Sequence, residues 1–169
     1  MRSKARAIGM VFDAVSLGAP EKAVGFMLWR VVHRYVREID RALVGLDLTH
    51  LQFTTLAMAA WLGRSAEPVT QAEVSRFAEI HPMQVSHMLK TLESKNLIAR
   101  RRSVSNARAK HIDITATGLT ALKRALPVVI DVQQRLFGDE GGSGGKLLTA
   151  LQRVDSETLL HRSDPAPTI

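Results

Sequence analysis

The stretch between Thr70 and Thr115 constrains the fold of this chain more than any other part of it. Thr70 and Glu73 form a capping-box pattern, in which each side chain accepts a hydrogen bond from the other residue's backbone N–H. A helix begun there should end near residues 80–81, because the residue before a proline avoids helical geometry. Pro82 then suits the first position of a second helix. The apolar residues for the buried side of the first helix are Ala72, Val74, Phe77 and Ala78.

The second predicted helix, Pro82–Lys95, has one apolar and one polar side. Apolar residues fall on one stripe at helical spacing: Val85, Leu89 and Leu92, with Met88 at its edge. Side chains that can donate or accept hydrogen bonds occupy the opposite side: Gln84, His87, Lys90, Thr91 and Ser94. Asn96 is expected to end the helix, because Asn tolerates the left-handed conformation of a C-terminal cap. Such a helix pair can enter a DNA major groove, although an ordinary helical hairpin with a solvated face also fits.

A basic hairpin is predicted directly after the second helix. Residues 97–102 and 108–114 have the composition of strands, and the polar residues 103–107 between them suit a turn. The cations of this hairpin are Arg100, Arg101, Arg102, Arg108 and Lys110, and its only acid is Asp113. Cations can protect an exposed sheet edge from aggregation. So many of them beside a helix-turn-helix favour contact with phosphate instead.

Together these motifs resemble the winged helix-turn-helix of the MarR (multiple antibiotic resistance regulator) family of bacterial transcription factors. The segments that carry the resemblance are Leu92–Ile98, Arg100-Arg101, Asn106–Ala109 and Ile114–Gly118, and the Leu-Thr-x-x-Gln-Phe pattern at 48–53 extends it to residues 20–118. The family usually has Gly at the position of Asn96 and Asp at the position of Asn106. The first difference keeps the capping role, and the second removes a carboxylate that could brace Arg108. The resemblance implies a triangular homodimer with two winged domains.

Long amphipathic helices are predicted on both sides of the winged domain. Pro20 is expected to open the first, whose wide apolar face continues to about Val44 before Gly45 breaks it. Thr49 is expected to cap the next helix. After the hairpin, the predicted elements are a helix over 116–137 capped by Thr115 and kinked at Pro127, a flexible glycine-rich link over 138–145, and a last helix over 146–160.

The predicted fold is mainly α-helical with a small β-hairpin wing: a winged helix-turn-helix flanked by long N- and C-terminal dimerisation helices. Its parts are a mobile N-terminal arm at 1–19, a helical dimerisation domain made of 20–48 and 116–162, the winged helix-turn-helix DNA-binding domain at 49–115, and a disordered tail at 163–169. The long helices carry more apolar surface than one small winged domain can cover. We therefore expect a homodimer, whose two copies read a palindrome.

Charge and cysteine content indicate which class of partner and which cellular compartment to expect. The 169 residues carry a formal charge of +7, which favours nucleic acid or an anionic membrane surface as partner. No apolar run approaches the roughly 20 residues that span a bilayer, so no spanning segment is expected, and of the two partners we expect nucleic acid and no membrane. The absence of cysteine excludes disulfides, a thiol nucleophile and a thiol-based redox switch, and it fits a reducing cytosol. We expect a cytoplasmic protein.

The sequence lacks the usual signatures of catalysis and of metal binding. The six histidines include no pair at the i, i+4 spacing of a zinc-binding helix. No glycine-rich loop has the Lys-Ser/Thr that holds phosphate, and no serine sits in a nucleophile elbow. We therefore expect neither an enzyme nor a cofactor. Two alternatives stay open: a winged domain used for protein–protein assembly, and a zinc-responsive regulator whose ligands come together only in the fold. A metal- or ligand-dependent enzyme is a third class, disfavoured by the missing signatures.

The expected function is that of a dimeric, sequence-specific transcriptional repressor that binds a pseudo-palindromic operator in double-stranded DNA. The helix Pro82–Lys95 would enter the major groove, and Arg108 at the tip of the wing would reach a narrow minor groove. Further contacts to bases or phosphates are expected from Gln84, Ser86, His87 and Lys90 on that helix, from Arg101, Arg102 and Lys110 in the wing, and from Thr70 and Gln71 at the start of the first short helix.

A small aromatic effector is the expected regulator. In the family that the chain resembles, such effectors commonly act in a cavity between the dimerisation domain and the winged domain. Trp29, His33, Phe53 and Trp61 offer apolar walls and a few polar groups for a ligand of this kind. Aromatic residues at helical spacing are more often part of a core, and that interpretation stays open beside the pocket.

Overall fold

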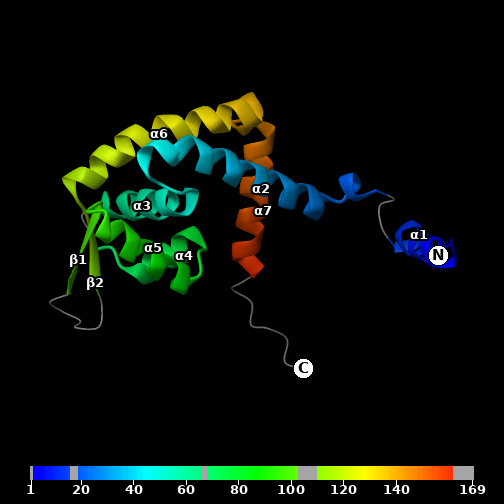
Figure 1. The fold of residues 1–169 in the computed structure, drawn as a ribbon, viewed down its shortest axis with the longest axis horizontal. Helices are drawn as coiled ribbons and strands as arrows, with labels where there is room; N and C mark the ends of the chain where they lie inside the picture. Colours follow the sequence, from blue (N-terminus) through cyan, green and yellow to red (C-terminus); the bar gives the residue numbers. More distant parts are fainter. Residues whose placement is uncertain (1, 16–18, 66–67, 103–109, 162–169) are drawn as a thin grey trace, which may run out of the picture. The chain divides into compact units, whose positions relative to one another are not determined.

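The computed structural model describes residues 2–15, 19–65, 68–102 and 110–161. Within these ranges it contains seven α-helices, three short 3-10 helices and one two-stranded sheet (Figure 1). This confirms the predicted class, mainly α-helical with a small β-hairpin. The chain divides into two compact units, residues 1–38 and 39–169.

The first unit consists of α1 (Arg2–Val15), the 3-10 turn η1 (Pro20–Lys22) and most of α2 (Val24–Leu43). The prediction that Pro20 opens the long helix was wrong. Pro20 opens η1, and Ala23 then adopts an extended conformation with φ −88° and ψ 113° before α2 begins. Both helices expose large apolar side chains, among them Ile8, Val11 and Phe12 on α1 and Leu28, Trp29 and Val32 on α2.

A corner in the second unit joins α2 to α3 (His50–Gly63). The 3-10 turn η2 (Val44–Leu46) follows α2, and Asp47 then takes a left-handed conformation with φ 52°. Ile39 and Leu43, on the last turns of α2, have no exposed surface. The end of α2 therefore belongs to the core of the second unit.

Two sets of hydrogen bonds fix the start of α3 at this corner. The Thr49 hydroxyl accepts Gln52 N at 3.2 Å, and Gln52 Oε1 accepts Thr49 N at 3.4 Å, which confirms the predicted cap. His50 N donates to Asp40 Oδ1 of α2 at 2.6 Å. Burial at this position lowers the pKa of His50, while the neighbouring Asp40 raises it by a smaller amount.

The helix-turn-helix is formed by α4 (Gln71–Ala78) and α5 (Pro82–Ser94). Thr70 N donates to Glu73 Oε2 at 2.7 Å, and Glu73 N donates to the Thr70 hydroxyl at 3.3 Å, which confirms the predicted capping box. α4 ends about a half-turn earlier than predicted, because Glu79 adopts a left-handed conformation with φ 51°.

The core beneath these helices is apolar and largely as predicted. Its fully buried residues include Leu56 of α3, Val74 of α4, and Val85, Leu89 and Leu92 of α5. Ala72 and Phe77, predicted for the buried side of α4, are exposed instead. α4 turns Ser75 inward, where its hydroxyl donates to the carbonyl oxygen of Ile80 at 2.6 Å and closes the turn.

The hairpin follows α5 as predicted. Asn96 is left-handed, with φ 56°, and leads into β1 (Ile98–Arg102), which pairs antiparallel with β2 (Lys110–Ile114). Ile112 N of β2 donates to Val69 O at 2.8 Å, which anchors the hairpin to the segment before α4. Figure 1 places the two strands at one end of the bundle of α3, α4 and α5.

The long helix α6 (Ala116–Phe137) follows the hairpin and passes over α3 (Figure 1). The Thr115 hydroxyl accepts Gly118 N at 2.9 Å, which confirms the predicted cap. Pro127 lies inside α6 without interrupting it, and the kink predicted there stays a prediction. Leu119, Leu126 and Ile130 lie at i, i+7 and i+11 on α6 and are exposed.

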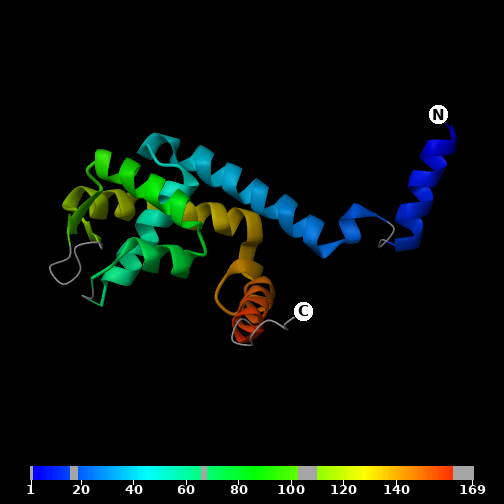
Figure 2. The ribbon, with the colours of Figure 1, turned by 90° about the horizontal axis from the view of Figure 1, so that it is seen from below.

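The prediction of a flexible link over 138–145 was wrong. Residues Gly138–Gly141 form the 3-10 turn η3, and Gly145 N donates to Gly142 O at 2.9 Å before α7 (Lys146–His161) begins. Gly138 and Gly144 have φ of 52° and 79°, which only glycine adopts easily. The glycines therefore serve a folded turn, after which α7 leaves the direction of α6 (Figure 2).

Candidate nucleic-acid interface

The outward face of α5 carries a stripe of four exposed side chains, Met83, His87, Lys90 and Ser94. They lie at i, i+4, i+7 and i+11, opposite the buried Val85, Leu89 and Leu92, and we call them the outer stripe. Two of the four predicted contact residues of this helix, His87 and Lys90, belong to it. Gln84 is exposed at its edge, and Ser86 is half-buried.

Met83 was missed by the sequence prediction, which selected side chains for their polarity. Counting by helical period from His87 would have found it, because Met83 precedes His87 by four residues. The side chain is 76% exposed. Its backbone is fixed, since Met83 N donates to Nδ1 of His81 at 3.2 Å in the first turn of α5.

Thr70 and Gln71 lie at the start of α4, as predicted, but both side chains already hold structural hydrogen bonds. The Thr70 hydroxyl donates to Glu73 Oε2 at 2.8 Å within the capping box. Gln71 Nε2 donates to Pro82 O at 3.1 Å and so links α4 to the first residue of α5. Thr70 thus caps α4 and Gln71 links α4 to α5, and the role of both residues toward phosphate stays a prediction.

The cations of the hairpin differ in what they contact. Arg101 is exposed and forms an exposed ion pair with Asp113, with 3.1 Å between Nε and Oδ2. Lys110 is exposed at the start of β2. Arg102 pairs with Lys110 in the backbone register of the sheet, while its side chain and the whole of Arg108 lie outside the described residues.

Arg100 braces the hairpin against α5. Its Nε donates to Glu93 Oε2 at 2.9 Å, a second bond runs from its Nη2 to the same oxygen, and its side chain is only 14% exposed. The hydrogen bond from Arg100 is the main reason that the pKa of Glu93 is lowered. Arg100 therefore orients β1 relative to α5 and is less available to phosphate than Arg101 or Lys110.

This brace predicts a pH-dependent contribution to stability. Because the folded pKa of Glu93 is lowered, the contribution is full above the unfolded value of about 4.3 and is lost as the pH falls through the folded pKa. The Glu93 side chain is 39% exposed, so solvent screening limits the effect to about 1 kcal/mol or less. Urea unfolding should show Glu93→Gln less stable than the wild type at pH 7, and by a smaller margin at pH 3. The same change at the exposed Glu21 is the control, and an equal difference at both pH values would contradict the assignment.

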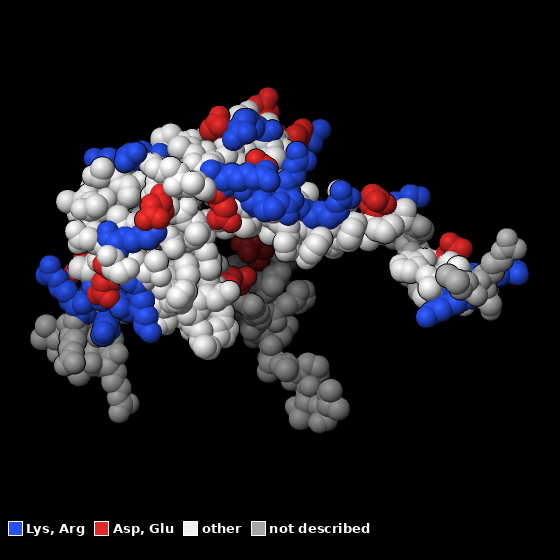
Figure 3. Space-filling model, in the orientation of Figure 1, with Lys and Arg blue, Asp and Glu red and all other residues white. Residues whose placement is uncertain are grey.

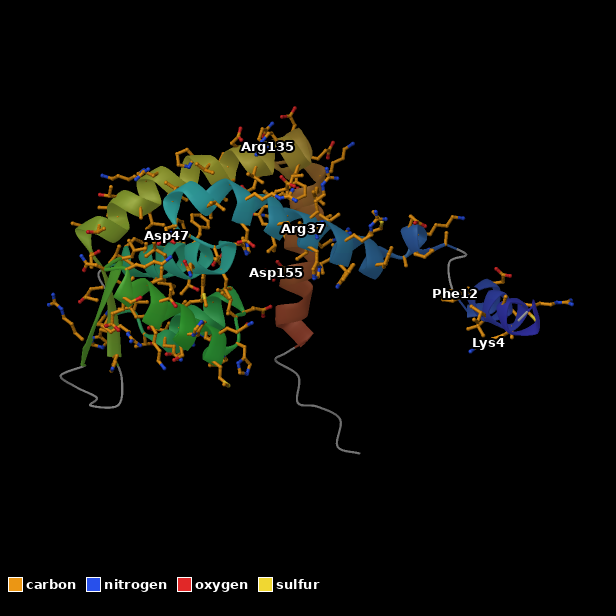
Figure 4. The ribbon with its side chains drawn as sticks, in the orientation of Figure 1. Lys4, Phe12, Arg37, Asp47, Arg135 and Asp155 are labelled. Carbon is orange, nitrogen blue, oxygen red and sulfur yellow. The ribbon has the colours of Figure 1, made fainter. Side chains whose placement is uncertain are left out.

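Lys95 ties the C-terminal end of α5 to the corner between α2 and α3. Its Nζ lies 3.1 Å from Asp47 Oδ2 and 3.1 Å from Gln52 Oε1, and it also donates to the Asp47 carbonyl oxygen. Asp47 is labelled in Figure 4 at this corner. The contact was not foreseen, because the residues that it joins are more than forty positions apart.

A groove runs between the start of α4, the start of α5 and the strands of the hairpin. Its lining includes Thr70, Gln71, Pro82, Arg100 and Lys110. Figure 3 shows Lys and Arg side chains gathered around the hairpin at this end of the second unit. The fold thus brings three predicted contact residues, Thr70, Gln71 and Lys110, together beside α5.

The four predicted ligand-binding residues fall into two pairs. Trp29 and His33 are neighbours on α2, with 4.3 Å between ring centroids and the ring planes tilted by 37°, and His33 Nδ1 lies 2.7 Å from Trp29 O. Phe53 is buried in the second unit, whereas Trp61 is exposed and has the Arg64 guanidinium 3.2 Å from its ring centroid. The pairs belong to different units, so a shared pocket stays a prediction.

Two kinds of site are absent from the part of the chain that the structure describes. In the described ranges, no three His, Asp or Glu side chains lie close enough together to hold a metal ion. None of the described helices is both long and apolar enough to cross a bilayer.

Comparison with known proteins finds similarity to transcriptional regulators. The family model described as "MarR family" matches residues 48–110. The HTH-type transcriptional repressor Rv2887 of Mycobacterium tuberculosis is 32% identical over 144 residues, which cover 85% of this chain and 95% of that protein.

Solved structures share the fold. CouR from Rhodococcus jostii, bound to p-coumaroyl-CoA, aligns with a TM-score of 0.68 and 25% identity over 89% of this chain and 97% of CouR. MosR of M. tuberculosis in complex with DNA aligns with a TM-score of 0.65 and 22% identity over 83% of this chain and 98% of MosR.

Proposed function

Since the chain belongs to the MarR family of transcriptional regulators, and is therefore no enzyme, we propose that it represses transcription as a homodimer bound to a pseudo-palindromic operator. We further propose that a small-molecule effector relieves the repression. In this proposal α5 reads the major groove, and Arg108 in the wing reaches the minor groove.

The observation that carries the DNA-binding part is the outer stripe with cations beside it. His87 and Lys90 point away from the core on α5, and Arg101 and Lys110 are exposed on the adjacent hairpin. A helix that presents polar side chains between cationic flanks suits a major groove bordered by phosphates. The fold is also shared with MosR, which was solved in complex with DNA.

The homodimer is supported by apolar surface that the single chain leaves open. Leu28, Trp29 and Val32 are exposed on α2, and Leu126 and Ile130 are exposed on α6. Large apolar side chains left exposed together on one helix often mark an interface. A dimer with twofold symmetry would place two copies of α5 on two half-sites of a palindrome.

A relative supports repression, and a solved structure supports the binding of a small molecule. Rv2887 is a transcriptional repressor, and CouR was solved with p-coumaroyl-CoA bound. For this chain we propose an aromatic effector that contacts Trp29, His33, Phe53 and Trp61. Such a ligand would weaken operator binding only if it favours a spacing of the two α5 helices that misfits DNA, and DNA would then weaken ligand binding by the same factor.

Two alanine variants of the outer stripe test the proposal. An operator is first selected from random duplex DNA with the wild-type protein. His87→Ala should weaken operator binding about tenfold while leaving random DNA unaffected, because a base contact carries sequence information. Lys90→Ala should weaken both to a similar degree and reduce the slope of log K against log salt by about one.

Lys123→Ala, on the exposed side of α6, is the matched control for Lys90→Ala and should retain the wild-type slope. If His87→Ala keeps the wild-type ratio of operator affinity to random-DNA affinity, α5 does not recognise the DNA sequence through this residue. If the wild-type protein binds no duplex DNA even at low salt, the alternative of a protein–protein assembly module is favoured.

A further inference from the structure

The outer stripe begins with an apolar residue where the proposed function would lead one to expect a polar one. Met83 is 76% exposed in the first turn of α5, directly after Pro82. An exposed apolar side chain gains nothing from water, and here its neighbours along the stripe are His87 and Lys90. Met83 therefore offers an apolar contact within an otherwise polar and charged stripe.

The N-terminal residues of a recognition helix contact base edges. A methionine offers only a weak acceptor and cannot distinguish bases by hydrogen bonding. The major groove presents one apolar group, the C5-methyl of thymine, and side chains read it by apolar contact. The flexible thioether chain of methionine can follow such a small target.

We propose that Met83 contacts the C5-methyl group of a thymine in each operator half-site and is a specificity-determining residue. This inference rests on the proposed DNA-binding function. Its geometry follows from the outer stripe: when His87 and Lys90 face the groove, the side chain of Met83 faces it one helical turn earlier.

Replacing thymine with deoxyuridine tests the contact, because the two bases differ only by the methyl group and pair identically. The operator selected by the wild-type protein is rebuilt with deoxyuridine at one thymine position per half-site, and each thymine position is scanned in turn. At one position, wild-type affinity should fall about fourfold per half-site, the usual worth of one buried methyl group, and so roughly 15-fold for both together.

Met83→Ala should bind the thymine and deoxyuridine operators within about twofold of each other at that position, since the shortened side chain no longer reaches the methyl group. Met10→Ala makes the same change at a methionine of α1 that is 64% exposed. This variant should lose as much operator affinity as the wild type when deoxyuridine replaces thymine. Circular dichroism of both variants checks that the fold is intact.

Three outcomes would overturn the inference. If the wild type binds all deoxyuridine operators as tightly as the thymine operator, no methyl group is read, while the proposed function stands. If Met83→Ala loses as much affinity as the wild type when deoxyuridine replaces thymine, another residue contacts the methyl group. If no operator can be selected at all, the inference and the proposed function fail together.

Discussion

Replacing Gly118 with alanine is expected to lower the free energy of unfolding by about 3 kcal/mol, the upper range for forcing atoms into a packed site. A Cβ at this position would lie 1.9 Å from the carbonyl oxygen of Leu97 and 2.9 Å from its carbonyl carbon. Both are backbone atoms, so no side-chain rotation can relieve the overlap. The clash outweighs the gain of about 1 kcal/mol that alanine normally brings to a helix.

The backbone of Leu97 cannot retreat without breaking the junction between the hairpin and α6. Thr115 N donates to Leu97 O at 3.2 Å, and the Thr115 hydroxyl donates to Asn96 O at 2.7 Å. These bonds hold the end of α5, the start of β1 and the start of α6 together. Gly118→Ala should therefore disturb the orientation of the hairpin as well as lower stability.

Thermal and urea unfolding measure the first effect, and the melting temperature should fall by roughly 6–12 °C. Gly9→Ala is the matched control, because Gly9 is a helical glycine of α1 with no atom within 4 Å of an added Cβ. It should leave the melting temperature unchanged or slightly raised. A Gly118→Ala protein as stable as the wild type would mean that α6 and Leu97 are not in close contact in solution.

The parts of the fold that the sequence predicted best are those fixed by neighbouring residues. Thr49, Thr70 and Thr115 were each predicted as helix caps, and each hydroxyl accepts the backbone N–H three residues later. The left-handed Asn96 and the antiparallel hairpin were predicted on equally local grounds. A hydrogen bond that spans three residues depends little on the rest of the chain, so a pattern of residue types is enough to identify it.

The predictions that failed relied on residue type without its surroundings. The glycines of 138–145 were taken for flexibility, yet a Cβ at Gly145 would lie 2.3 Å from the carbonyl oxygen of Asp139. Arg100 was counted with the free cations of the hairpin, although Glu93 of α5 already binds it. Neither contact can be read from residue type alone, because the first depends on how the turn between α6 and α7 closes and the second on how the hairpin packs on α5.

Apolar periodicity also could not separate the core from an interface. Phe53 and Trp61 both belong to the apolar pattern of α3, but the structure buries Phe53 and exposes Trp61. The same holds for α6, where Leu122 and Val129 are buried while Leu126 and Ile130 are exposed. The sequence shows that such a helix is apolar on a wide face, and only the fold shows which part of that face remains uncovered.

The second large effect is expected for Ile130→Glu, a change on the exposed apolar face of α6. Ile130 is 60% exposed, and in the proposed homodimer its side chain would be buried against the other copy. A lone carboxylate buried there without a partner would cost several kcal/mol, enough to shift the dimer to monomers at micromolar concentration. Operator affinity should then fall about 100-fold or more, because one winged domain contacts only one half-site.

Sedimentation measures the assembly, and titration of the operator measures binding. Thr120→Glu is the control, since it adds the same charge to an exposed position of α6 on the side that carries Arg124 and Asp131. It should remain dimeric. An Ile130→Glu protein that sediments as the wild type does would show that the exposed face of α6 is not the dimer interface.

The dependence of operator binding on protein concentration distinguishes a variant that no longer dimerises from one that no longer folds. If Ile130→Glu leaves the monomer folded, raising the protein concentration restores the dimer by mass action and operator binding recovers with it. Because two monomers must bind each operator, the recovery should follow the square of the monomer concentration, whereas binding by a preformed wild-type dimer follows the dimer concentration to the first power. A variant that had simply unfolded would show no recovery at any concentration. The slope of this dependence therefore shows whether the exposed apolar face of α6 supports the dimer or the fold of the monomer.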